Sequence, residues 1–395
     1  MIYFLKVFIC IALLGMILPV SAQTSPSTIV SPSSKIQLPQ LDEAAEISLI
    51  TYTPGEELYQ AFGHSAIRIK DNALSIDRLY GFGTFDFETP NFYLKFARGD
   101  LLYQLNVTVG EDDIREVGAY GQGISELPLN LSGEQKQKLF ESLEINLLPD
   151  NRFYRYDFAL DNCSTRVRDA FEQVIGSQIQ ESGAGKLTFR QMLDVYFART
   201  PWTHFGVDLL LGSTMDRIAT AREACFLPAD LERAVESARN GDQKLAGPKQ
   251  EIFPPGDLPQ PVWFLSPLAL FSCAGGIWFL IWLVRRRPHA RWLSALYLTV
   301  FGAAGAFVCF ISFWSQHWVV RANYNQLWLI PTHLPVGIWL FFAKPKIVIL
   351  YLWFALIAAL GFLAFSWSIP QVFEPTVYPL IIILAWRCAL EIYPV

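Results

Sequence analysis

The C-terminal third of the chain constrains the fold most, because it contains almost no charge. Residues 262–395 hold 8 basic and 2 acidic residues, whereas residues 23–261 hold 22 basic and 34 acidic ones. Ten charges cannot cover the surface of a water-soluble domain of 134 residues, so we expect this part of the chain to lie in lipid. The composition excludes a soluble enzyme and a disordered protein, and the net charge of −5 excludes a nucleic-acid binder that relies on a basic field.

The apolar tail divides into five runs, each close to the length of about 20 residues that crosses a membrane. The runs are 262–284, 292–314, 326–343, 347–367 and 376–393. Pro331, His333 and Pro335 interrupt the third run, and an ionisable residue such as His333 inside a membrane is a functional candidate. The pattern predicts an all-α bundle of about five transmembrane helices over residues 262–395.

Two independent signals indicate the orientation of the chain. Residues 1–22 are typical of a signal peptide, with Lys6 before the apolar run Val7–Val20, and an uncleaved anchor helix is the alternative. Seven basic residues fall on one side of the predicted bundle: Arg285, Arg286, Arg287, Arg291, Lys344, Lys346 and Arg387. Only Arg321 falls on the other side, so we expect the first side and the C-terminus in the cytoplasm and the N-terminal domain outside it.

The exported residues 46–245 are predicted to form one α+β domain, with strands early and helices later. Apolar patterns predict strands at Ile47–Thr53, Ser65–Lys70, Asp77–Gly83 and Leu101–Val109, and helices at Ser132–Leu148, Asp161–Ile175 and Pro228–Arg239. Ser132 and Gln135 have the spacing of a capping box, and Asp161 or Asn162 is expected to cap the second helix. Residues 23–45 are expected to be a flexible lead-in, and residues 246–261 a proline-rich linker.

The exported part contains two histidines and two cysteines, His64, His204, Cys163 and Cys225. It has no CxxC, HExxH or GxSxG motif, so we expect no metal and no cofactor, and a Cys/His pair remains. Cys163 stands at a predicted helix start, where unpaired N–H groups favour the thiolate, and His64 opens a strand after Gly63, a rigid position for a general base. A Cys163–Cys225 disulfide and a purely structural His64 are the alternatives.

Three stretches of the exported domain and one of the tail carry a family resemblance. They are Pro54–Ala66 (PGEELYQAFGHSA), Tyr80–Phe87 (YGFGTFDF), Tyr154–Arg166 (YRYDFALDNCSTR), and His317 followed by Asn323-Tyr324-Asn325. These stretches resemble the Lnb family of bacteroidetes lipoprotein N-acyltransferases, although that family often carries Asn where this chain has Gly81. More distantly, a Gly-His motif on a strand before an Asn-Cys motif at a helix start resembles circularly permuted papain-like enzymes such as lecithin:retinol acyltransferase.

The resemblance implies a permuted papain-like domain in the periplasm, anchored in the inner membrane. It implies transfer of a fatty acyl chain from a phospholipid to the α-amino group of a diacylated lipoprotein. Cys163 would form a thioester and His64 would move the proton. The residue that orients His64 is expected to be Asp77, with Tyr80 and Asp86 as alternatives. Substrate contacts are expected from Arg166, Tyr80, His317, Asn323 and Asn325.

Several of these expectations have alternatives. The domain could instead hydrolyse peptides or cell-wall amides with the same Cys/His pair, or serve as a non-enzymatic membrane-tethered binding module. Arg166 could be paired or solvated rather than bound to phosphate, and the polar residues of the tail could be interfacial anchors. The apolar stretch 201–212 could line an acyl channel, lie in the membrane interface or belong to a core.

Overall fold

A computed structural model describes residues 38–55, 57–180, 185–256, 260–285 and 291–393. The expected signal peptide and most of the lead-in lie outside the described residues. The end of the lead-in is ordered against the domain, because Leu41 and Ala45 are buried and the backbone N–H of Asp42 donates to Asp71. The N-terminal domain therefore begins a few residues before its first strand.

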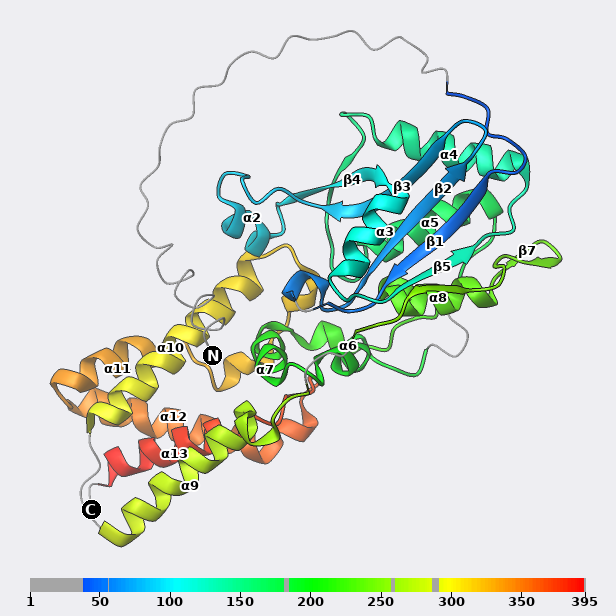
Figure 1. Cartoon of the computed structure of the whole chain (residues 1–395). Helices are drawn as coiled ribbons and strands as arrows, with labels where there is room; N and C mark the ends of the chain where they lie inside the picture. The colour runs from blue at the N-terminus through cyan, green and yellow to red at the C-terminus, as the bar shows by residue number, and fades with distance from the viewer. Residues whose placement is uncertain (1–37, 56, 181–184, 257–259, 286–290, 394–395) are drawn as a thin grey trace, which may run out of the picture. The chain divides into compact units, whose positions relative to one another are not determined.

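The N-terminal domain is built on a seven-stranded sheet in which every neighbouring pair is antiparallel, in the order β6-β4-β3-β2-β1-β5-β9. Figure 1 shows its central strands β4, β3, β2, β1 and β5 side by side. The strands are β1 Glu46–Tyr52, β2 His64–Asp71, β3 Ile76–Thr84, β4 Leu102–Val109, β5 Ile124–Pro128, β6 Phe153–Arg155 and β9 Gln250–Phe253, and a separate hairpin joins β7 Arg239–Asn240 to β8 Gln243–Lys244. The four strands predicted from the apolar patterns are present, within two residues at each end.

Helices cover both faces of this sheet. On one face lie α4 Gly133–Asn146, α5 Cys163–Ile175 and α8 Pro228–Ser237, and on the other lies α3 Gly110–Ala119. The capping box of Ser132 and Gln135 is present at α4, and Asn162 rather than Asp161 caps α5. The α+β class is thus confirmed.

The expected linker 246–261 is partly a strand. Residues Gln250–Phe253 form β9 and pair with β5, and the backbone N–H of Gly247 donates to the carbonyl of Pro128. Residues 250–253 can form this strand because they contain no proline, and prolines 254, 255, 259 and 261 all follow them. Their backbone groups pair with an otherwise exposed edge of the sheet. The free spacer before the membrane domain is correspondingly shorter than the sequence indicates.

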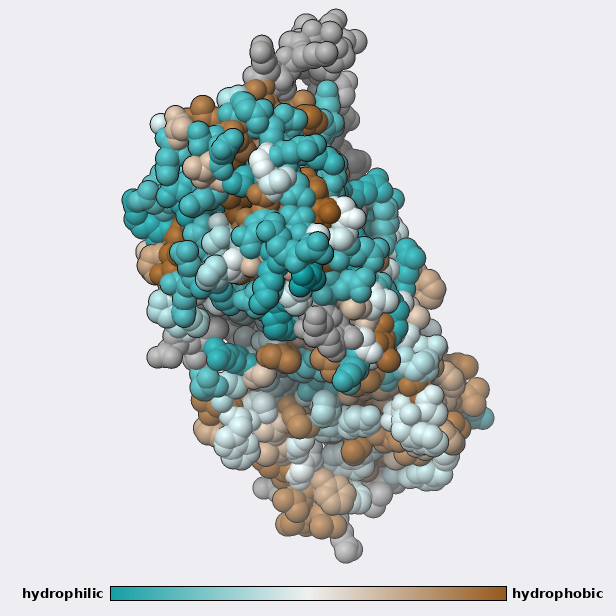
Figure 2. Space-filling model, turned by 90° about the vertical axis from the view of Figure 1, so that its right-hand side faces the viewer, coloured by the Kyte–Doolittle hydropathy of each residue, from teal (hydrophilic) through white to brown (hydrophobic). Residues whose placement is uncertain are grey.

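Among the described residues of the C-terminal domain there are five α-helices: α9 Pro267–Arg285, α10 Arg291–Trp314, α11 His333–Phe342, α12 Lys346–Phe365 and α13 Val377–Ile392. Within the described residues, three spans are long and apolar enough to cross a membrane: Pro267–Val284, Arg291–Trp314 and Lys346–Ser368. Figure 2 shows hydrophilic residues over most of the visible sheet domain and more hydrophobic ones over the helical part below it. The chain therefore has a sheet-rich N-terminal domain and a helical C-terminal domain with several apolar helices.

The third expected run, 326–343, differs from the structure. Only His333–Phe342 is α-helical, because Pro331 lacks an N–H and the residues before it form the short helix η7 Tyr324–Leu327 and a turn. His333 is buried and hydrogen-bonded, with one ring nitrogen 3.1 Å from the Trp328 carbonyl and the other 2.7 Å from the Tyr351 hydroxyl. These contacts identify His333 as a structural residue of the bundle.

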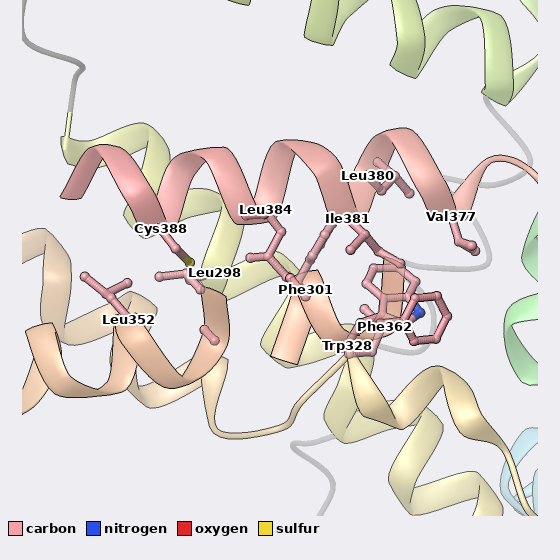
Figure 3. Packing of buried hydrophobic residues seen from close by; sticks show 14 of the residues in the cluster. Leu298, Phe301, Trp328, Leu352, Phe362, Val377, Leu380, Ile381, Leu384 and Cys388 are labelled. Atoms are coloured by element: carbon pink, nitrogen blue, oxygen red, sulfur yellow. The ribbon is translucent and has the colours of Figure 1, made fainter. Parts of the chain in front are cut away.

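The core of the membrane domain packs aromatic and aliphatic side chains from α10, α12 and α13 and from Trp328, which follows η7. Figure 3 shows members of this cluster: Leu298, Phe301, Trp328, Leu352, Phe362, Val377, Leu380, Ile381, Leu384 and Cys388. Gly302 lets α11 approach α10 closely, since a Cβ there would lie 1.9 Å from the Leu334 nitrogen. Arg387, which the orientation argument counts with the cytoplasmic loops, lies inside the bundle and donates to Ser294.

The N-terminal domain contacts the membrane domain through α6 Phe189–Phe197 and α7 Pro201–Leu210. Phe205 of α7 belongs to the hydrophobic cluster of the membrane helices. The side-chain amide of Asn323 donates to the carbonyls of Leu209 and Leu210, and so binds the C-terminal end of α7. The apolar stretch 201–212 is therefore shared core, which fixes the domain against the outer end of the bundle.

Candidate active site

Cys163 is the first residue of α5, directly after the capping residue Asn162. The Asn162 side chain accepts a hydrogen bond from the Thr165 N–H and donates to the carbonyls of Phe158 and Phe226, at 2.7–2.9 Å. A capping residue with every polar atom engaged holds the first turn rigidly. The thiol is therefore fixed at the positive end of a 13-residue helix, as expected from the sequence.

His64 opens β2 directly opposite Tyr52 of β1. Gly63 before it has φ 79°, and a Cβ there would lie 2.3 Å from the Tyr52 carbonyl oxygen, so only glycine fits. Glycines of β3 also leave room for the site: a Cβ on Gly81 would lie 3.3 Å from Nε2 of His64, and one on Gly83 would lie 3.9 Å from Cβ of Cys163. Gly63, Gly81 and Gly83 thus lie around the two candidate catalytic side chains.

The first turn of α5 is attached to β2 next to this pair. The hydroxyl of Ser164 lies 3.1 Å from that of Ser65, and both side chains are fully buried. His64 and Cys163 themselves keep partial solvent exposure. The structure therefore places the candidate nucleophile and base together at a partly exposed position.

The charges of the pair favour a thiolate and an imidazolium. Burial alone raises the pKa of the Cys163 thiol, but the charge and hydrogen bond of His64, the Ser65 N–H and the Ser164 hydroxyl outweigh it, so that the net pKa is lowered. Burial alone lowers the pKa of His64, but the charge and hydrogen bond of Cys163 and the charge of Asp113 raise it above its ordinary value. This is the polarisation that a cysteine nucleophile requires.

Asp113 of α3 is a site residue that sequence reasoning missed. One carboxylate oxygen accepts a 2.6 Å hydrogen bond from the Tyr52 hydroxyl and the other accepts one from Thr108. The Tyr52 ring lies between this carboxylate and His64, with its centre 5.9 Å from that of the imidazole. Only the register that pairs Tyr52 with His64 reveals the connection, and no local motif marks Asp113.

Asp77, the residue expected to orient His64, lies elsewhere. It pairs with Lys70 in the β2–β3 register, six residues along β2 from His64, which corresponds to roughly 20 Å. Its carboxylate accepts two 2.8 Å hydrogen bonds from Arg68 and one from the Glu111 N–H. This placement contradicts an orienting role for Asp77. Asp86, the looser alternative, accepts a hydrogen bond from the Glu88 N–H within its own turn.

Tyr80 and Arg166 are also held by structural partners. The buried Tyr80 hydroxyl donates to Glu144 of α4 at 2.6 Å, on the sheet face away from His64. Arg166 makes two hydrogen bonds to Asp161 at 2.6 and 2.8 Å and stacks 3.6 Å above the centre of the Tyr154 ring. Both groups are therefore engaged by protein partners, and for Arg166 the alternative of a paired residue describes the structure.

The three tail residues join the two domains. Asn323 binds the carbonyls at the end of α7, and Asn325 is buried and accepts a hydrogen bond from the indole N–H of Trp328. The ring of His317 has Nε2 2.9 Å from the carbonyl of Phe96. The two asparagines therefore have structural hydrogen bonds within the protein, and His317 links the membrane domain to residues 92–98.

The remaining candidates also have structural explanations. Cys225 lies buried near the carbonyls of Ile179 and Ala221, and no disulfide joins it to Cys163. Asp194, His204 and Asp208 bring possible metal ligands within 4.8 Å of one another. Asp208, however, already makes a 2.7 Å ion pair with the buried Arg190, which also binds Asp216. The Arg190 guanidinium supplies the positive charge that a metal would bring, so this cluster fits a structural ion-pair network.

Comparison with known protein families agrees with this two-domain organisation. The family model described as the Lnb N-terminal periplasmic domain matches residues 40–195. The one described as the Lnb transmembrane domain matches residues 259–394. Comparison with curated proteins and with solved structures gives no match. The two family models together cover most of the chain, including Cys163, His64 and the loop that begins at His317.

Proposed function

Since the chain belongs to the Lnb family, and is a membrane protein with a periplasmic N-terminal domain, we propose that it is a lipoprotein N-acyltransferase that works through a thioester on Cys163. The acyl donor is a phospholipid, and the acceptor is the α-amino group of a diacylglyceryl-cysteine lipoprotein. The observation that carries the proposal is the polarised Cys163–His64 pair in a domain packed on membrane helices. Both substrates are anchored in that membrane.

In the first half of the reaction, the Cys163 thiolate attacks an ester carbonyl of the phospholipid. A C–S bond forms, the ester C–O bond breaks, and the His64 imidazolium gives its proton to the departing glycerol oxygen. The products are a thioester on Cys163, a lysophospholipid and neutral His64. The Cys163 N–H at the start of α5 is a donor for the oxyanion that develops on the carbonyl.

In the second half, the α-amino group of the lipoprotein attacks the thioester. A C–N bond forms and the C–S bond breaks, while His64 takes the proton that the amine loses. The products are the N-acylated lipoprotein, the Cys163 thiolate and the His64 imidazolium, which is the starting state. Asp113, through its charge, favours the imidazolium in both halves.

The proposed location is the inner membrane, with the C-terminus in the cytoplasm. Arg291, Lys344 and Lys346 flank membrane helices at the end of the bundle opposite the N-terminal domain, and such residues are retained on the cytoplasmic side. The N-terminal domain then lies at the outer leaflet, where phospholipid esters and exported lipoproteins are both accessible.

The decisive experiment is to trap the acyl-enzyme. Purified full-length protein in phospholipid vesicles, without acceptor, is expected to gain the mass of one fatty acyl chain on Cys163, and Cys163→Ala to gain none. Mass spectrometry of lipoprotein N-termini from cells with Cys163→Ala is expected to show loss of the N-linked chain. Unchanged N-termini would contradict the proposal, and altered cell-wall peptides with unchanged lipoproteins would favour an amide hydrolase.

A further inference from the structure

The short helix α2, Phe92–Arg98, exposes large apolar side chains next to the membrane domain. None of its residues is buried. The exposed fractions are 58% for Tyr93, 44% for Leu94 and 51% for Phe96, and the preceding loop exposes 62% of Phe87. A contiguous apolar surface of this kind is unfavourable in water and marks an interaction site.

Contacts of α2 place it at the outer end of a membrane-spanning helix (Figure 1). The carbonyl of Phe96 lies 2.9 Å from Nε2 of His317, and the carbonyl of Arg98 accepts a hydrogen bond from the Gln316 N–H at 2.7 Å. The Arg98 guanidinium lies 5.0 Å from the ring centre of Trp314. Trp314 is the last residue of the span Arg291–Trp314, so α2 lies where that helix leaves the lipid.

A continuous row of aromatic rings joins α2 to the active site. The ring of Phe92 lies 5.7 Å from that of Phe85, which lies 5.3 Å from Tyr103, which stacks on Tyr156 at 4.4 Å. Tyr103 also lies 6.4 Å from the ring of Tyr154, and this ring reaches the nucleophile: a Cβ added at Gly83 would lie 3.9 Å from both the Tyr154 hydroxyl and Cβ of Cys163. The row therefore connects α2 to the nucleophile by ring contacts, with Phe85 and Tyr156 partly exposed and Tyr103 buried between them.

We propose that α2 inserts into the outer leaflet and delivers a phospholipid acyl chain along this aromatic row to Cys163. Tyr93, Leu94 and Phe96 enter the interface, and Lys95 on the same helix attracts the phosphate of the headgroup. Insertion into lipid stands on the exposure and position of α2 alone. Delivery of the acyl chain rests on the proposed acyltransferase function.

Photo-crosslinking tests the insertion directly. Full-length protein carrying p-benzoylphenylalanine at Tyr93 is reconstituted in vesicles of phosphatidylethanolamine and phosphatidylglycerol, irradiated, and analysed by mass spectrometry for phospholipid adducts. Ile145 of α4 is the matched control position, because its side chain is 52% exposed. We expect an adduct yield at position 93 at least fivefold above that at position 145. A yield within fivefold of the control would overturn the proposal.

A second arm tests delivery of the acyl chain. The double variant Tyr93→Glu/Phe96→Glu is expected to raise KM for vesicle phospholipid at least tenfold. Iodoacetamide should still alkylate Cys163 of this variant at the rate of the unmodified protein, which shows that the domain is folded. Ile145→Glu is expected to leave KM unchanged. An unchanged KM in the double variant would overturn delivery. If the proposed function is wrong, all variants lack acyl transfer while the crosslinking pattern stays as described.

Discussion

Replacing His64 by Ala tests whether the active site is an ion pair. In the structure, the charge and hydrogen bond of His64 are the two largest factors that lower the pKa of the Cys163 thiol, and burial opposes them. Without the imidazole, burial is balanced only by the Ser65 N–H and the Ser164 hydroxyl. We therefore expect the pKa of Cys163 in His64→Ala to return to the ordinary cysteine value of about 8.5 or above.

The size of the effect follows from that value. A thiol with a pKa of about 8.5 is only about 3% thiolate at pH 7, and the lowered pKa of Cys163 in the unmodified protein increases that fraction. Alkylation of Cys163 at pH 7 should therefore slow in His64→Ala, by up to about thirtyfold. This factor corresponds to about 2 kcal/mol. Acyl transfer should fall further, by an additional factor of about 10²–10⁴, because the proton donor for the leaving oxygen is also lost.

The assay is the rate of iodoacetamide alkylation of Cys163 between pH 5 and pH 10, followed by peptide mass spectrometry. The other histidine of the periplasmic domain supplies the control, and His204→Ala should leave the profile unchanged, because this ring contacts Asp194 and Asp208 instead. A profile with the ordinary cysteine pKa in the unmodified protein, or one that His64→Ala does not shift, would refute the ion pair.

Three further substitutions test the surrounding structure. Asp113→Asn removes a charge that raises the pKa of His64, so the imidazolium should lose its proton at lower pH. The alkaline limb of the pH profile of kcat/KM should therefore move to lower pH by about half a unit. An unchanged alkaline limb would show that Asp113 does not act on His64. Arg190→Leu removes the guanidinium that pairs with the buried carboxylates of Asp208 and Asp216, and should cost about 3–5 kcal/mol in denaturant unfolding. Arg115→Ala, in an exposed ion pair, should cost less than about 1 kcal/mol. Asn323→Ala removes the hydrogen bond to the Leu210 carbonyl and the shorter of two side-chain hydrogen bonds to the Leu209 carbonyl, and should cost about 1–3 kcal/mol. Thermal unfolding in detergent measures the effect, and an unchanged midpoint would contradict the role of Asn323 in joining the domains.

The sequence predicted local features well where one short pattern determines them. The strands around Ile47 and Ser65, the capping box of Ser132 and the helix that starts at Cys163 depend on alternation, 3.6-residue periodicity and cap chemistry within a few residues. The α+β class, the membrane helices and the family followed from the same kind of evidence.

Predictions for individual polar residues were less successful, because a polar side chain takes its role from distant partners. Asp77 follows His64 at a plausible distance in sequence, yet the antiparallel register puts it at the far end of the strand beside Arg68. Asn323 reads as a loop residue, although it caps a helix more than 100 residues earlier in the chain. Neither partner is visible in a local pattern.

By itself, the sequence determined that this protein has an exported α+β domain and an apolar helical tail, and it identified Cys163 and His64 as the candidate pair. These conclusions depend on composition and short-range periodicity, which the chain carries in any fold. Only the tertiary structure decided that the charge of Asp113 acts on His64, that α7 shares a core with the membrane helices, and that α2 exposes aromatic residues next to the end of α10. The reason is physical: strand register and domain packing bring these groups together across tens to hundreds of residues, and burial then sets their charges and contacts.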